Sequence, residues 1–171
     1  MKRIAIIGSG GAGKSTLAIQ LGEILGIEVT HLDALHWKPG WTPTPEEEWR
    51  ALQEQLIQRE SWIIDGNYGA TLDIRLTAAD TIIFLDYPTL VCLYRAFKRR
   101  LLYRGRTRPD MGTGCHERIE WSYIKRILDY RREKRPSVMA RIEQHSGKRV
   151  VILHSPREVK HFLEETRRET P

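Results

Sequence analysis

The stretch Gly8-Ser9-Gly10-Gly11-Ala12-Gly13-Lys14-Ser15 decides the fold of this 171-residue chain. It matches the pattern G-x-x-x-x-G-K-[ST], in which backbone N–H groups of a glycine-rich turn surround a phosphate group. An apolar strand is expected over residues 2–7, directly before the turn. From Lys14 onward apolar residues recur at helical spacing until Gly26. A strand, a glycine turn and a helix in this order predict a phosphate-binding loop (P-loop) rather than a simple turn.

Each residue of the P-loop has an expected role in binding ATP. Lys14 is expected to reach the β- and γ-phosphates, Ser15 to ligate Mg²⁺ through its hydroxyl, and Thr16 to approach the α-phosphate. The other expected ATP contacts in the loop are Gly8, Gly10, Gly11, Ala12 and Gly13.

Strands and helices alternate along the rest of the chain. Strands are expected over 27–32, 62–65, 81–86 and 149–154, and helices after an N-cap at Thr44 and over 90–101, 118–132 and 156–167. Loops are expected over 36–45 and 105–115. No internal repeat interrupts this order. The alternation predicts an α/β protein with a doubly wound parallel sheet, whose ligands bind at the carboxyl ends of the strands.

The net charge of +6 is unevenly distributed. Residues 94–135 carry fourteen Lys or Arg and five Asp or Glu, a balance of +9, whereas the rest of the chain has a balance of −3. A basic segment of this kind indicates an anionic partner, such as nucleotide phosphates or nucleic acid, or else a solvated helix face.

Composition excludes several classes of protein. No apolar run approaches the roughly 20 residues that a membrane helix needs, and the apolar residues after Lys2-Arg3 are too few for a secretory signal. Two cysteines form no disulfide framework, so a cytoplasmic location is expected. Cys115 and His116 alone cannot build a closed zinc site. His31, His145 and His161 are expected to be ordinary surface or packing histidines.

The sequence resembles nucleoside monophosphate kinases over nearly its whole length. The resemblance rests on the P-loop, on Asp65-Gly66 after the third expected strand, on Asp86-Tyr87-Pro88 after the fourth, and on residues 151–157. It implies the sheet order 2-3-1-4-5, with strands numbered along the chain. It also implies that Arg95 stacks on adenine, that Arg99 contacts ATP phosphates, and that the loop at Pro156 holds the base.

A narrower resemblance is to bacterial proteins called DNA topology modulation proteins, which are P-loop kinase-like and related to adenylate and shikimate kinases. It rests on Asp33-x-x-His36-Trp37, on Asp65-Gly66-Asn67-Tyr68 and on Gly105-Arg-Thr-Arg-Pro-Asp110. The family name describes a cellular phenotype and specifies no reaction.

Two carboxylates compete for the role of Mg²⁺ ligand. Asp65 is favoured because the resemblance places its strand beside the P-loop, whereas Asp86 is expected to cap the following helix. Arg99 is expected to neutralise charge on the transferring phosphoryl group. Arg104 and Arg106, with Arg108, lie in an expected lid over 103–116 that would exclude water on closure.

The acceptor side departs from adenylate kinases. The arginines that grip an acceptor phosphate there are missing at the matching positions, and Arg75 is the nearest later candidate. A carboxylate after the second strand, Asp33, is instead typical of kinases that act on hydroxylated small molecules. The expected acceptor-binding residues are Asp33, His36, Trp37, Asn67 and Tyr68.

These patterns predict an ATP- and Mg²⁺-dependent kinase of a small-molecule acceptor. It would form one P-loop kinase-like domain over 1–171, with an acceptor-binding insert over 34–61. The predicted catalytic residues are Lys14, Asp33, Arg99, Arg104 and Arg106. Two alternatives are a nucleic-acid-associated ATPase that affects DNA topology and a regulatory ATP sensor with slow turnover. The acceptor, the choice between ATP and GTP, and the oligomeric state stay open.

Overall fold

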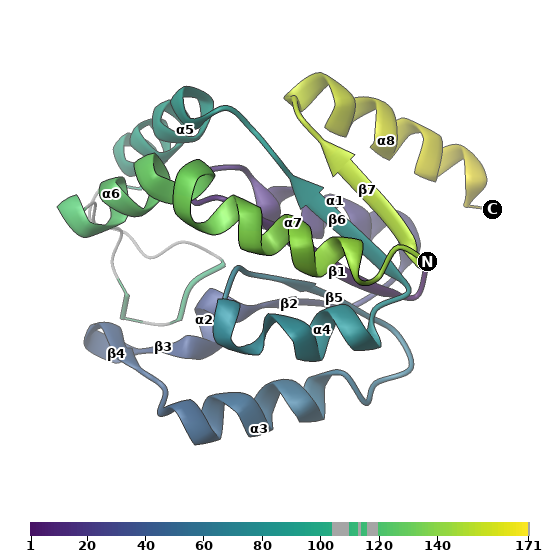
Figure 1. Ribbon diagram of the computed structural model, residues 1–171, viewed down its shortest axis with the longest axis horizontal. Coiled ribbons are helices and arrows are strands. Elements are labelled where there is room, and N and C mark those ends of the chain that lie inside the picture. The colour runs from purple at the N-terminus through teal and green to yellow at the C-terminus, as the bar shows by residue number, and fades with distance from the viewer. Residues whose placement is uncertain (104–109, 113, 116–119, 171) are drawn as a thin grey trace.

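The computed structural model describes residues 1–103, 110–112, 114–115 and 120–170. Within these residues the central feature is a five-stranded parallel sheet in the order β2-β5-β1-β6-β7 (Figure 1). The strands are β1 (Arg3–Gly8), β2 (Val29–His31), β5 (Trp62–Asp65), β6 (Thr81–Leu85) and β7 (Arg149–Leu153). Numbered among themselves along the chain, they follow the order 2-3-1-4-5. The predicted fold class and strand order are confirmed.

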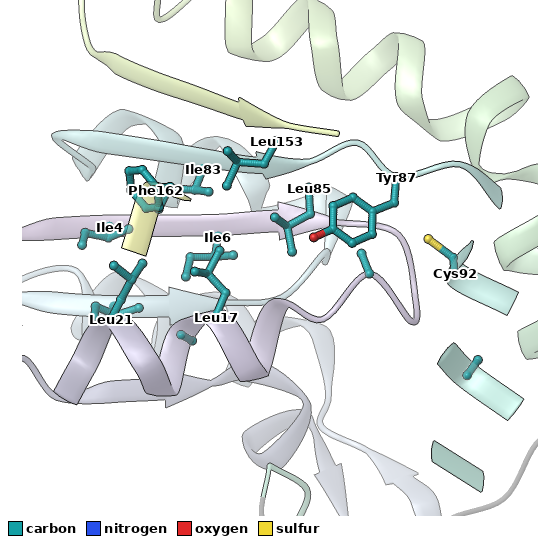
Figure 2. Close-up of a cluster of buried hydrophobic side chains, with 14 of the residues drawn as sticks. Ile4, Ile6, Leu17, Leu21, Ile83, Leu85, Tyr87, Cys92, Leu153 and Phe162 are labelled. Atoms are coloured by element: carbon teal, nitrogen blue, oxygen red, sulfur yellow. The ribbon is translucent and has the colours of Figure 1, made fainter. Parts of the chain in front are cut away.

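One face of the sheet packs against α1 (Lys14–Leu25) and α8 (Pro156–Glu169). Alternate residues of a strand point to opposite faces, and Ile4 and Ile6 of β1 point to this one. Figure 2 shows them packed with side chains of α1 and with Phe162 of α8. The helix that follows the P-loop is therefore fixed to the sheet along its length.

The opposite face packs against α3 (Glu46–Leu56), α4 (Leu72–Ala78) and α7 (Arg135–Glu143). In Figure 1, α4 and α7 lie in front of the sheet and α3 lies below them. Ala5 and Ile7 of β1 point into this second core. A parallel sheet buried on both faces explains why its strands read as apolar runs rather than as alternating patterns.

The fully buried residues of helix α5 (Thr89–Leu102) are small, and several of its large apolar residues are exposed. Cys92 and Ala96 are buried, whereas Leu90 is 79% exposed and Leu101 is 76% exposed. The reason is that this helix approaches the backbone of the P-loop, and only small side chains admit so close an approach.

The stretch after β2 contains short elements where a loop was predicted. Helix α2 (Leu32–His36) is followed by a two-stranded antiparallel ribbon of β3 (Trp37–Lys38) and β4 (Thr42–Pro43), joined by the turn η1 (Pro39–Trp41). The predicted N-cap at Thr44 is wrong, because Pro45 caps α3. The Thr44 hydroxyl bonds instead to the carbonyls of Leu35 and His36, at 3.2 and 3.0 Å.

The predicted helix over 118–132 ends too early. Helix α6 (Trp121–Asp129) continues through a π-helical turn, η3 (Tyr130–Lys134), directly into α7. Pro136 lies in the first turn of α7, where a missing N–H costs little. The turn η2 (Gly69–Thr71), which leads into α4, was not predicted either.

None of the helices in the described part of the chain combines the length and the apolar character that a bilayer crossing requires.

Candidate functional site

The P-loop lies between the end of β1 and the start of α1. Gly11 has a φ of 76°, and a Cβ atom there would overlap the carbonyl oxygen of Cys92 on α5. Gly13 has a φ of 94° and lies against the guanidinium group of Arg95. Glycine alone combines a left-handed conformation with such close approach. The loop is therefore held in shape by the sheet on one side and by α5 on the other.

Lys14 begins α1 and directs its ammonium group back over the loop. Its Nζ donates to the carbonyl oxygen of Ser9 across 3.0 Å. Burial lowers the pKa of Lys14, while the charges of Asp33 and Asp65 act in the opposite direction. A lysine over a glycine-rich loop is placed to contact the β- and γ-phosphates of a nucleotide, and two carboxylates lie close enough to act on it.

Asp65 ends β5, the neighbour of β1, and joins two side chains. Ser15 Oγ donates to Asp65 Oδ2 across 2.8 Å, and His31 Nδ1 lies 2.6 Å from Asp65 Oδ1. Burial acts to lower the pKa of His31, but the hydrogen bond and charge of Asp65 outweigh it, so the pKa is raised.

The Ser15–Asp65 pair fits a magnesium ion. Hydroxyl and carboxylate oxygens are ligands that Mg²⁺ prefers, usually with water and substrate phosphates completing its shell. In the described ranges no cluster of three or more His, Cys, Asp or Glu side chains is arranged to hold a metal.

Asp86, the rival to Asp65, is bound elsewhere. The Arg135 guanidinium group donates to its carboxylate at 2.8, 2.9 and 3.0 Å, and Arg131 and His154 lie 3.9 and 3.6 Å away. Burial acts to raise the pKa of Asp86, but Arg135 outweighs it and holds the pKa below its ordinary value. The N-cap of α5 is Pro88, so the prediction that Asp86 caps that helix is wrong. Asp86 instead ties α7 to the sheet.

Helix α5 brings Arg95 and Arg99 to the P-loop from the same side, as their i, i+4 spacing predicts. Arg95 lies over the ring of Tyr87, 5.6 Å from its centroid, and donates to the carbonyl of Ala12 across 3.4 Å. Arg99 Nη2 donates to the hydroxyl of Tyr123 across 3.0 Å. Two cations thus flank the loop where nucleotide phosphates would lie.

Asp33 and Tyr68 form another wall of the site. The Tyr68 hydroxyl donates to Asp33 Oδ1 across 2.7 Å. Burial, followed by the charge of Asp33, raises the pKa of Tyr68, so its phenol stays protonated. Trp37 and Asn67 line the same cavity, and Asn67 Oδ1 accepts a hydrogen bond from the backbone N–H of Gly8 across 3.4 Å. This wall combines a carboxylate with aromatic surface.

His36 packs behind this wall. Its ring lies among Trp37, Trp49 and Tyr68, with centroids 4.7 to 4.9 Å apart. Its Nδ1 is buried without a hydrogen-bond partner among the described residues, and burial lowers the pKa of the ring. His36 therefore supports the two aromatic side chains that line the cavity, and a direct contact with an acceptor stays a prediction.

These walls enclose one cavity of about 1400 Å³. A site for one small molecule has roughly 300–1,000 Å³, so this cavity has room for a nucleotide and a second ligand. The predicted residues in its lining are Gly10, Gly11, Gly13, Lys14, Ser15, Thr16, Asp33, Trp37, Asn67, Tyr68, Arg95, Arg99 and Pro156. The predicted residues that are described but do not line it are Gly8, Ala12, His36 and Asp65.

The structure adds residues that the sequence reasoning missed. His31 is no ordinary packing histidine, because it is bonded to Asp65. Its position two residues before Asp33, at a strand end, was a usable signal. Tyr123 and Trp41 also line the cavity. No sequence signal marked them, since they reach the site only through packing of α6 and of the β3–β4 ribbon.

Arg75 is not available to an acceptor. Its side chain is fully buried, Nη1 donates to Gln53 Oε1 across 2.6 Å, and Nη2 donates to the Gly66 carbonyl across 3.3 Å. Burial lowers its pKa to about 10. The prediction that Arg75 contacts an acceptor is wrong, because the guanidinium group belongs to a core network.

Part of the predicted lid lies outside the described residues. This applies to Arg104, Arg106, Arg108 and His116. Their predicted roles stay predictions.

Comparisons with known proteins place this architecture among P-loop kinases. No protein-family model matches the chain, and no curated protein matches it. A shikimate kinase from Acinetobacter baumannii in complex with shikimate has a TM-score of 0.60 at 18% identity, covering 96% of this chain and 90% of that one. A gluconokinase from Sinorhizobium meliloti 1021 has a TM-score of 0.52 at 22% identity, covering 99% and 89%.

A deoxyadenosine kinase from M. mycoides with bound dATP has a TM-score of 0.51 at 19% identity, covering 99% of this chain and 98% of that one. At these identities the likeness establishes the fold alone. The chain has the α/β fold of P-loop kinases, and the similar structures cover nearly all of it.

Proposed function

We propose that this protein is an ATP- and Mg²⁺-dependent kinase that phosphorylates a hydroxyl group of a small molecule, within a single domain over 1–171. The observation that carries the proposal is the convergence of three functional groups in one cavity. Lys14 rises from the P-loop, Ser15 is bonded to Asp65, and Asp33 lies close enough to act on the pKa of Lys14. The names of the similar structures, all kinases, support a small-molecule acceptor.

The donor half of the site is assigned to the P-loop and its surroundings. Lys14 would contact the β- and γ-phosphates, and Ser15 with Asp65 would hold Mg²⁺, which offsets phosphate charge when bound. Arg95 and Pro156 would hold the adenine base. Arg99 would neutralise charge on the transferring group, and Arg104 and Arg106 of the lid over 103–116 would close over it.

The acceptor half is assigned to the insert over 34–61 and to the residues around Asp33. The acceptor hydroxyl would attack the γ-phosphorus, forming a new P–O bond while the bond to the β-phosphate oxygen breaks. The hydroxyl proton would pass to the Asp33 carboxylate. Tyr68 holds that carboxylate in place, and Trp37, Asn67 and His36 shape the surrounding wall. Because ATP and small acceptors are cytoplasmic metabolites, the proposal includes a cytoplasmic location.

The proposal is tested by ATP consumption with Mg²⁺ across a panel of acceptors. The panel contains nucleosides, nucleoside monophosphates and hydroxylated metabolites, with duplex DNA measured separately. We expect one small molecule to stimulate turnover and to appear phosphorylated in the mass spectrum. Asp33→Asn should lower that turnover at least 100-fold while the affinity for ATP is kept, and the exposed Asp73→Asn serves as the matched control.

A nucleic-acid-associated ATPase remains the alternative from the basic segment 94–135. Several basic side chains of this segment have other contacts in the structure. Arg135 is paired with Asp86, and Arg95 and Arg99 face the P-loop. Stimulation by duplex DNA alone, at physiological salt and with no small molecule active, would replace the kinase proposal with this one.

A further inference from the structure

Tyr123 on α6 contacts the proposed catalytic machinery at two points. Its hydroxyl accepts a hydrogen bond of 3.0 Å from Arg99 Nη2, and the Arg99 guanidinium carbon lies 5.5 Å from the centroid of its ring. A cation at this distance from a tyrosine ring is attracted to its face. The hydroxyl and the ring therefore both hold the guanidinium group of Arg99.

The same ring lies against the P-loop at Gly10. A Cβ atom on Gly10 would be 2.8 Å from the Tyr123 hydroxyl oxygen and 3.1 Å from two ring carbons. Such distances are shorter than side chains normally allow, so the absence of a side chain at Gly10 makes room for Tyr123. The tyrosine thus sets the separation between the loop backbone and Arg99.

The position of Tyr123 is itself fixed. Its backbone N–H bonds to the carbonyl of Glu120 in the first turn of α6, and its side chain packs against the core beneath the P-loop. Arg126, one turn along the helix, lies 5.8 Å from the centroid of the same ring. Tyr123 is therefore anchored independently of Arg99.

We infer that Tyr123 is a positioning residue that fixes Arg99 over the P-loop for phosphoryl transfer. This inference rests on the proposed function. An arginine on a helix surface samples many rotamers, and fixing one in advance removes that entropy cost from the reaction. A positive charge stabilises the transferring phosphoryl group most strongly in the transition state. Misplacement of Arg99 should therefore lower kcat more than it weakens ATP binding.

The inference is tested by a double-mutant cycle between Tyr123→Phe and Arg99→Ala, measured on basal ATP hydrolysis with Mg²⁺, which needs no acceptor. In the wild-type background we expect Tyr123→Phe to lower kcat roughly tenfold, the size of one hydrogen bond to a charged group, with KM for ATP nearly unchanged. In the Arg99→Ala background the same substitution should change kcat less than about twofold, because its target is gone. His161→Gln, exposed on α8 and outside the lining of the cavity, is the control.

A second measurement is the gain in ADP affinity on adding aluminium fluoride, which mimics the transferring phosphoryl group. We expect Tyr123→Phe to reduce that gain and to leave the affinity for ADP alone unchanged. If Tyr123→Phe lowers kcat equally in both backgrounds, or keeps the full gain, Tyr123 does not act through Arg99 and the inference is overturned. If the wild-type protein neither hydrolyses ATP nor binds ADP more tightly with aluminium fluoride, the proposed function is overturned, and the inference is overturned with it.

Discussion

The hydroxyl of Ser15 and the carboxylate of Asp65 are joined by a hydrogen bond of 2.8 Å, although 50 residues separate them in the chain. They meet because β5 pairs with β1 in parallel, so that both strands end at the same edge of the sheet. In this arrangement Ser15, in the first turn of α1, faces Asp65, which ends β5. A magnesium ion bound by both would lie beside the phosphates that the loop holds.

Asp65→Asn should raise the Mg²⁺ concentration needed for half-maximal ATP turnover at least tenfold, because the variant loses the negative charge at the proposed metal site. Ser15→Ala should act in the same direction. A Mg²⁺ titration of turnover measures both, with Glu60→Gln on the exposed surface as the control. An unchanged titration for Asp65→Asn would remove Asp65 from the metal site.

Lys14→Ala should lower the rate of ATP turnover at least 100-fold and leave the fold intact. The Lys14 side chain is partly buried beside the cavity and its ammonium group bonds to the Ser9 carbonyl, so its removal eliminates a charge at the loop rather than a core contact. Turnover and the thermal midpoint are measured on the same preparation, beside the exposed control Lys160→Ala. Wild-type turnover in Lys14→Ala would mean that the P-loop does not bind the reacting phosphates.

Asp86→Asn should destabilise the protein by about 2 kcal/mol near neutral pH, because it breaks the ion pair between the buried Asp86 carboxylate and the partly exposed Arg135 guanidinium group. The pKa of Asp86 in the folded state lies below its ordinary value of 3.8. The pair therefore contributes its full stability above about pH 5, and loses it as the pH falls through the folded-state pKa.

Urea unfolding of the wild type and of Asp86→Asn across this pH range tests that prediction. The difference in unfolding free energy between them should be constant from neutral pH to about pH 5 and should shrink in stronger acid. Asp73→Asn, which removes an exposed carboxylate, should change stability by less than about 0.5 kcal/mol. A difference that stays constant at low pH would show that the charge of Asp86 is not what stabilises the fold.

Arg75→Ala should cost about 3 kcal/mol of stability or more, since it leaves Gln53 Oε1 and the Gly66 carbonyl without their donor and opens a cavity. The KM for ATP should change little in the fraction that remains folded. Chemical unfolding measures the loss, with the exposed Arg59→Ala as the control. A raised acceptor KM at unchanged stability would return Arg75 to the acceptor site.

The sequence by itself determined the P-loop, the alternation of strands and helices, and the side of α5 that carries Arg95 and Arg99. These features depend on local patterns: a strand is an apolar run, a helix has a 3.6-residue period, and two arginines four residues apart share one face. The sequence also favoured Asp65 over Asp86, because the resemblance to nucleoside monophosphate kinases placed its strand beside the P-loop, and the pairing of β5 with β1 confirms that placement.

Only the tertiary structure decided which of the remaining polar groups serve the site and which serve the core. The sequence offered Arg75 as a candidate for the acceptor site, yet the packing of α4 against the sheet buries it beside Gln53. Tyr123 reads as an ordinary helical residue, yet the packing of α6 against α5 sets it over Gly10 and Arg99. Local patterns predict which face of a helix or strand is apolar. Contacts between residues distant in the chain depend instead on how whole helices and strands pack together, which no short stretch of sequence specifies.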